Sequence, residues 1–186
     1  MRKITVLATL GFFLLGFAWS VTAKEKQIGS GDIIIVRLAP RDPRAFLLGD
    51  YMALNYDLNQ QVDKALYAKY SEGQNPRWNR GTSEETGYIP RDGVAIVCLD
   101  DAGIATFIRL DDGENLTPDE HRLYFRYRDG GAKVAASSYY FQEGYAKDFE
   151  RAEYGELRVD KSGKSLLMYM LDKDMQRIQP HVKKSD

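Results

Sequence analysis

The sequence is poor in the residues that build metal centres, disulfides and most hydrolytic sites. It contains one cysteine, Cys98, and two histidines, His121 and His181. A single cysteine can form neither an intramolecular disulfide nor a cysteine-based zinc site. An H-x-x-x-H pair, a G-x-S-x-G motif and a phosphate-binding glycine loop are also missing from the sequence. A metal, triad or nucleotide enzyme is therefore disfavoured, and we expect no cofactor, no metal and no catalytic residue.

An excess of basic charge is lacking as well. The 26 basic residues face 27 acidic ones, which gives a formal net charge of -1. Residues 1–23 include Arg2 and Lys3 and no acidic residue, so the rest of the chain is more acidic than the whole. A nucleic-acid-binding domain needs a basic surface to neutralise phosphates. We therefore expect no nucleic-acid partner.

The N-terminal segment lacks charge over a long stretch. After Arg2 and Lys3, the run from Ile4 to Ala23 contains no charged residue. A helix of this length, at about 1.5 Å per residue, would cross a hydrocarbon core of about 30 Å, so the run can anchor the chain in a membrane. The same order of basic, apolar and small residues is typical of a signal peptide cleaved near Ala23. We favour the uncleaved anchor, and in either case the basic end is expected to face the cytoplasm.

The remaining pattern predicts a β-rich domain. Runs of alternating or β-branched residues predict strands at residues 32–38, 93–99, 103–110 and 121–128. After a turn at residues 129–131, KVAASSYYF is predicted to be a return strand, and a turn at 161–163 predicts a later hairpin. The fold class is therefore mainly β (α+β), an antiparallel sheet, barrel-like or a sandwich, with one or two short helices.

The predicted boundaries follow from these elements. We divide the chain into a membrane anchor or signal segment, a polar linker, a single β-rich extracytoplasmic domain and a polar tail, at residues 1–23, 24–31, 32–172 and 173–186. The fold prediction thus includes a transmembrane helix before the domain.

The stretch around residue 50 has the clearest alternation. Two prolines make PRDPR a rigid connector, and a strand is predicted from Asp50 onward. Its core face would hold Met52, Leu54, Tyr56 and Leu58. Asp50 shares that face and needs a partner, for which Arg44 is the candidate. A helix at residues 60–70, capped by Asn59, is predicted to follow.

One predicted strand carries three arginines on a single face. In HRLYFRYR, the apolar side chains of Leu123 and Phe125 alternate with Arg122, Arg126 and Arg128. The arginines could bind an anion or pair with the later acids Glu143, Glu150 and Glu156. Because nearby carboxylates are as numerous as the guanidiniums, we expect pairing.

The acidic segment DDGENLTPDE precedes that strand and could suggest a calcium site. Its spacing does not match the twelve-residue EF-hand loop, which has a central glycine and a terminal glutamate. We therefore expect a solvated turn.

Several short motifs carry a resemblance to a known family. Gly49, Asp50, Tyr51, Leu54 and Tyr56 form the pattern G-D-Y-x-x-L-x-Y, preceded by DPR at 42–44 and followed by FQEG at 141–144 and YGELRVD at 154–160. Together they resemble the bacterial GDYXXLXY family over nearly the whole chain. The resemblance implies a small membrane-anchored protein, here a single-pass inner-membrane protein with its domain in the periplasm, or a periplasmic protein if cleavage occurs near Ala23. It leaves the chemistry open.

The sequence favours a non-enzymatic interaction module for a neighbouring membrane protein or an envelope ligand. The alternative is a signal-peptidase-like or other envelope hydrolase, although no Ser-x-Met-Pro-like element and no lysine-bearing strand is recognisable. Besides the inner membrane, contacted through residues 4–23, the expected partner is a membrane protein. The predicted contact surface consists of Asp42, Arg44, Gly49, Asp50, Tyr51, Leu54, Tyr56, Glu143, Gly144, Arg151, Tyr154, Gly155 and Glu156.

Overall fold

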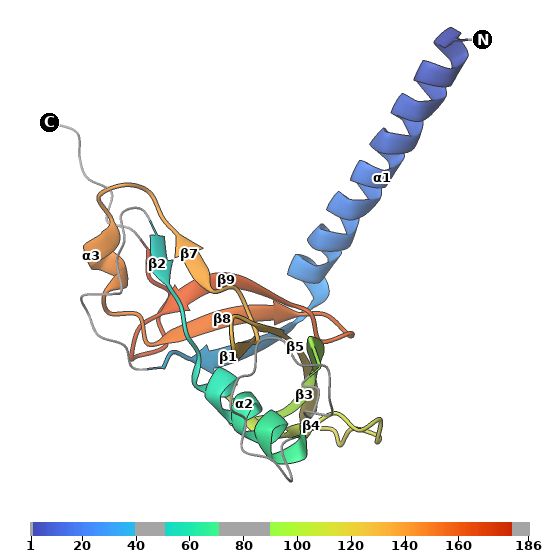
Figure 1. Ribbon diagram of the computed structural model, residues 1–186. Coiled ribbons are helices and arrows are strands. Elements are labelled where there is room, and N and C mark those ends of the chain that lie inside the picture. Colours follow the sequence, from blue (N-terminus) through green and yellow to red (C-terminus); the bar gives the residue numbers. More distant parts are fainter. Residues whose placement is uncertain (1, 40–50, 71–89, 180–186) are drawn as a thin grey trace, which may run out of the picture.

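The computed structural model describes residues 2–39, 51–70 and 90–179. In these ranges the strands form three antiparallel sheets, accompanied by few helices (Figure 1). The domain is therefore mainly β, as the strand pattern predicts.

The first sheet joins the two ends of the domain. It consists of β1 (Asp32–Arg37), β8 (Tyr154–Val159) and β9 (Ser165–Leu171), with β8 in the centre. Ile35 lies opposite Glu156, and β8 and β9 form the hairpin predicted around residues 161–163. Ile34 and Leu157 are fully buried, so one face of this sheet belongs to the core.

The second sheet has the order β4-β3-β5-β6. Its strands are β3 (Asp92–Leu99), β4 (Ala105–Leu110), β5 (Glu120–Arg128) and β6 (Gly131–Lys133). The predicted hairpin between β3 and β4 is confirmed, and so is the alternation along β5. Leu123 and Phe125 are buried, whereas Arg126 and Arg128 are exposed.

The strand predicted from Asp50 is shorter than expected. β2 covers Tyr51–Ala53 only, and α2 (Asp57–Tyr70) begins three residues before the predicted helix start. Leu58 explains the difference. It lies two residues after Tyr56, which fits the alternation of a strand, and four residues before Val62, which fits one face of a helix. Asn59 is therefore not the N-cap but a residue of the helix. The predicted burial of Met52, Leu54, Tyr56 and Leu58 is confirmed.

The predicted return strand is interrupted. β6 ends at Lys133, and β7 (Ser138–Tyr140) pairs with β2 in a separate two-stranded sheet. Between β6 and β7, backbone groups bond to side chains of the β2–α2 region in place of a neighbouring strand. The Val134 amide donates to Asn59 Oδ1 (3.1 Å), and the Ala136 carbonyl accepts from the Tyr56 hydroxyl (2.9 Å). A short helix, α3 (Ala146–Phe149), follows β7 and buries Phe149.

Helix α2 completes the core. It lies against β4, β6 and β1 and buries Leu58, Val62 and Leu66, which are spaced for one helical face. Asp63 holds β6, because its Oδ1 accepts the Ala132 amide (2.7 Å).

Helix α1 (Arg2–Ser30) projects away from the sheets (Figure 1). The segment Lys24–Ser30, expected to be a linker, is its last part, as suits a run of the good helix formers Lys, Glu and Gln. The side chains of residues 2–5, 7, 8 and 23 lie outside the description. No helix in the described part of the chain is long and apolar enough to cross a membrane.

Candidate functional site

A cavity of about 520 Å³ lies where α1, β5, β6 and the β8–β9 turn meet. Its size falls within the range of about 300–1,000 Å³ that is common for small-molecule sites. One carboxylate, Asp129, lines it together with five cations, Lys24, Arg126, Arg128, Lys133 and Lys164. We call this site the basic cavity.

No ion pair with a carboxylate neutralises any of the five cations in the described part of the chain. Within the described ranges, none of them has a carboxylate oxygen within 4.0 Å, the limit of an ion pair. Lys24 Nζ donates to Gln27 Oε1 (3.1 Å), and Arg128 NH1 donates to the carbonyl of Tyr127 (2.8 Å). These neutral acceptors orient the cations and leave their charge in place.

Two of the cations act on carboxylates at a longer range. Burial raises the pKa of Asp63, and the amide of Ala132 and the charge of Lys133 partly offset that rise. Partial burial alone would raise the pKa of Asp160, but hydrogen bonds from Ser162 and Lys164, with the charge of Lys164, bring it below its usual value. The charges of Asp63 and Asp160 thus act on two of the five cations without forming an ion pair, and Arg126 and Arg128 have no such carboxylate in the described ranges.

The β8–β9 turn forms one wall and lies directly against β5. The Tyr124 amide donates to the Gly163 carbonyl (2.7 Å), and Gly163 has φ +86°. A Cβ at Gly163 would lie 3.0–3.1 Å from backbone atoms of Tyr124 and Arg122. Only glycine combines this φ with so close an approach, and the contact places Lys164 beside the arginines of β5.

Residues 134–137, with Ser165 beside them, form a second wall. The Leu54 amide donates to the Ser137 carbonyl (2.8 Å), and the Tyr56 hydroxyl donates to Ala136. From the other side, Ser165 Oγ donates to the Val134 carbonyl (2.8 Å). Residues of the G-D-Y-x-x-L-x-Y pattern therefore hold a wall of the basic cavity.

The C-terminal end of α1 forms one edge of the site. Gln27 is buried, and its Nε2 donates to the carbonyls of Lys164 (2.7 Å) and Arg158 (3.3 Å). Since Gln27 Oε1 also accepts from Lys24, one side chain links the helix, the turn and a cavity cation. The helix is thereby fixed to the domain at the cavity edge.

The predicted pairing of the β5 arginines with later acids is wrong where the structure describes it. Glu156 is buried on β8, and both its carboxylate oxygens accept hydrogen bonds from Arg177 (2.9 Å each), which also lies over the ring of Tyr169. The pattern could not show this, because Arg177 comes from the segment expected to be a polar tail. Arg126 and Arg128 keep no carboxylate partner in the described ranges.

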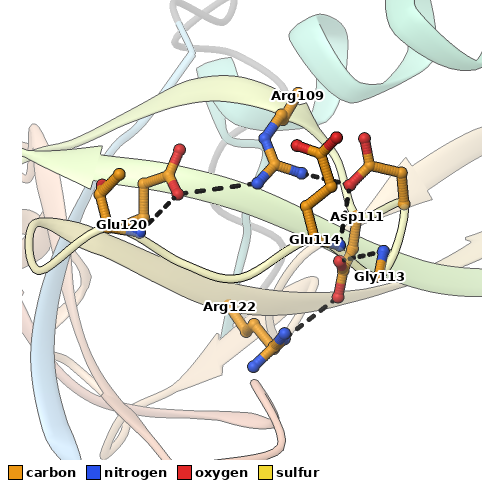
Figure 2. A network of polar contacts seen from close by, with 8 residues as sticks. Arg109, Asp111, Gly113, Glu114, Glu120 and Arg122 are labelled. Carbon is orange, nitrogen blue, oxygen red and sulfur yellow. Dashed lines mark hydrogen bonds and ion pairs between the residues drawn. The ribbon is translucent and has the colours of Figure 1, made fainter.

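Arg122 differs from its two neighbours. Its Nε donates to Asp111 Oδ2 (3.1 Å), within a network in which Arg109 contacts Asp112 (2.6 Å) and Glu120 (3.7 Å) (Figure 2). Three carboxylates of the acidic segment, those of Asp111, Asp112 and Glu120, are thus engaged with arginines and backbone amides such as that of Gly113. No group of three or more His, Cys, Asp or Glu side chains suited to a metal occurs in residues 2–39, 51–70 and 90–179.

The predicted contact surface is only partly described. Asp42, Arg44, Gly49 and Asp50 lie outside the described residues, and with them the proposed clamp. Glu143, Gly144 and Arg151 are exposed near α3. Tyr154 and Gly155 are buried on β8, and Tyr51 packs its ring against Tyr140 (5.6 Å between centroids). Leu54 and Tyr56 are buried beneath the cavity wall.

Sequence reasoning identified two cavity cations and missed three. Arg126 and Arg128 stand out because they alternate with buried residues. Lys24, Lys133 and Lys164 lie on three separate segments, and no local pattern connects them.

A family model described as GDYXXLXY protein matches residues 13–170. No curated protein and no solved structure is similar enough to the chain to count as a match.

Proposed function

The chain belongs to the GDYXXLXY protein family, and from that premise we propose that it is a non-enzymatic binding module, held at a membrane by its N-terminal segment, whose basic cavity takes an anionic ligand. One observation carries the proposal. Five cations and one carboxylate line a single cavity, and no cation there has an ion pair in the described part of the chain.

Like charges gathered in this way repel one another, which costs folding free energy unless a counter-charge is bound. Arginines that hold the fold together pair with carboxylates, as Arg109, Arg122 and Arg177 do, whereas the five cavity cations gather in one place without such a partner. Anion binding offsets the repulsion, and guanidinium and ammonium groups offer complementary donor geometries to phosphate or carboxylate oxygens. The function therefore requires no bond-making step.

The membrane attachment is supported by the uncharged run from Ile4 to Ala23 and by the exposed apolar side chains of α1, among them Phe12 and Trp19. With Arg2 and Lys3 in the cytoplasm, the domain lies on the periplasmic side of a bacterial inner membrane. An uncleaved anchor predicts that the protein stays in the membrane pellet after alkaline carbonate treatment and has its full mass. Release together with a mass that begins after Ala23 would replace the anchor by a signal peptide.

The anion site is tested with the full chain purified in a non-ionic detergent. Thermal unfolding is followed while inorganic phosphate replaces chloride at constant ionic strength. We expect a saturable rise in melting temperature, with an apparent affinity at least tenfold weaker in Arg126→Ala and Lys164→Ala. Lys147→Ala removes one exposed cation from α3, outside the cavity, and should bind as the wild type does.

A response that does not saturate, or that is the same in all four proteins, would refute the anion site. Arg126 is exposed and the side chain of Lys164 makes no hydrogen bond within the described residues, so both variants are expected to fold.

A further inference from the structure

The basic cavity lies next to the point where the uncharged N-terminal run ends. Lys24, which lines the cavity, directly follows Ala23, the last residue of that run. The helix continues without a break through Ser30, so the spacing along its axis is fixed. Gln27, which docks on the β8–β9 turn, lies three residues further, or about 5 Å along the axis.

This spacing can be compared with the thickness of a bilayer. The headgroup layer on each side of the hydrocarbon core is about 5–8 Å thick. If the uncharged run occupies the core, the cavity edge formed by Lys24 and Gln27 lies at headgroup depth. The cavity, at about 520 Å³, has room for a phosphate with its attached glycerol.

We infer that the basic cavity binds the phosphate headgroup of an anionic phospholipid from the membrane to which α1 leads. This inference rests on the proposed function, because it names the ligand of that same site. Five cations against one carboxylate favour a headgroup with net negative charge over a zwitterionic one, whose ammonium group they would repel. The hydrogen bonds of Gln27 to Lys24 and to the β8–β9 turn hold the cavity at the height of the headgroups.

Helix α1 provides a matched pair of lysines for the test. Lys24 and Lys26 are both exposed at nearly the same depth, but two residues of helix turn their side chains to opposite sides, and only Lys24 lines the cavity. Diffuse attraction between a basic segment and an anionic surface would depend equally on both. A built headgroup site depends on Lys24 alone.

The experiment uses the full chain in detergent, offered an equimolar mixture of phosphatidylglycerol and phosphatidylcholine with identical acyl chains. Native mass spectrometry then measures the lipid retained. We expect the wild type to retain phosphatidylglycerol at least fivefold over phosphatidylcholine, with that preference lost in Lys24→Ala and Arg126→Ala and kept in Lys26→Ala.

Equal loss in Lys24→Ala and Lys26→Ala, or an unchanged preference in Arg126→Ala, would overturn the lipid assignment. If phosphate binding still depends on Arg126 in the melting assay, the cavity binds a soluble anion and the proposed function stands without the lipid. If neither phosphate nor phosphatidylglycerol responds to Arg126→Ala, the proposed function fails as well.

Discussion

The hydroxyl of Tyr56 donates a hydrogen bond to the carbonyl of Ala136, 2.9 Å away and 80 residues later in the chain. Tyr56 is only 1% exposed, and burial raises the pKa of its hydroxyl, which therefore remains a donor at every physiological pH. The last tyrosine of the G-D-Y-x-x-L-x-Y pattern is thus a support for the wall of the basic cavity. This relationship connects the sequence pattern that defines the family to the site we propose.

Tyr56→Phe should destabilise the domain by about 0.5–1.5 kcal/mol, the net contribution of one hydrogen bond, because Ala136 is exposed and water can replace the lost donor. Chemical denaturation of the full chain measures the change. Tyr140→Phe is the matched control, since Tyr140 is 74% exposed and should show no significant effect. Equal stability of the two variants would mean that the hydrogen bond contributes nothing.

Gly163→Ala should cost about 2–4 kcal/mol. The positive φ alone costs a non-glycine residue about 1–2 kcal/mol, and the new Cβ would also meet the backbone of β5 at 3.0–3.1 Å. Gly113→Ala separates the two causes, because Gly113 has φ +88° but nothing within 4 Å of its Cβ position. In urea denaturation, Gly163→Ala should therefore have a clearly lower free energy of unfolding than Gly113→Ala. Equal free energies of unfolding would show that the turn can move away from β5.

The strand pattern was predictable because it is local. β5 alternates over nine residues, and each hairpin turn carries an Asp and a Gly within four residues, so period and turn chemistry agree. The start of α2 was not predictable, because Leu58 satisfies the spacing of a strand and of a helix. Only the contacts of Asn59 with Asn55 (2.9 Å) and Val134 decide between them, and Val134 lies far along the chain.

The candidate site was less predictable than the fold for the same reason. The arginine face of β5 indicated two cations, but the expected partner Glu156 is taken by Arg177. Lys24 contributes to the cavity because Gln27 docks α1 on the β8–β9 turn. The residues that Gln27 contacts lie 131 and 137 positions further along the chain, and contacts at such a separation leave no periodic signal in the sequence.

Acid should weaken the β8–β9 turn through Asp160. Oδ1 of Asp160 accepts hydrogen bonds from the amides of Ser162 (2.8 Å) and Lys164 (3.0 Å), and its pKa is lowered in the folded state. A lowered pKa means that the stabilisation is complete above the unfolded-state value of about 4 and is lost as pH falls through the folded-state value. The stability difference between wild type and Asp160→Asn should therefore be constant near neutral pH and shrink below about pH 4.

Urea denaturation between pH 7 and pH 3 checks this expectation. Asp101→Asn serves as the control, because the Asp101 carboxylate has no hydrogen bond or ion pair in the described part of the molecule. A difference for Asp160→Asn that stays constant down to pH 3 would show that the charge of Asp160 does not stabilise the turn.

Met175→Gly should stabilise the domain by about 0.5–1 kcal/mol. Three turns begin with an aspartate whose Oδ1 accepts amides two and four residues later, namely those starting at Asp100, Asp160 and Asp172. The fourth residue has positive φ in each, and it is glycine in the first two turns but methionine in the third, at φ 61°. Glycine removes a strain of about 1–2 kcal/mol there and adds unfolded-state entropy of about 0.5–1 kcal/mol, so the net change is a gain in stability.

Lys173→Gly is the control, because it lies in the same turn but has no positive φ. It adds the same unfolded-state entropy and relieves no strain, so it should lower the melting temperature while Met175→Gly raises it. A fall in both variants would show that the packing of the half-buried Met175 side chain outweighs its backbone strain.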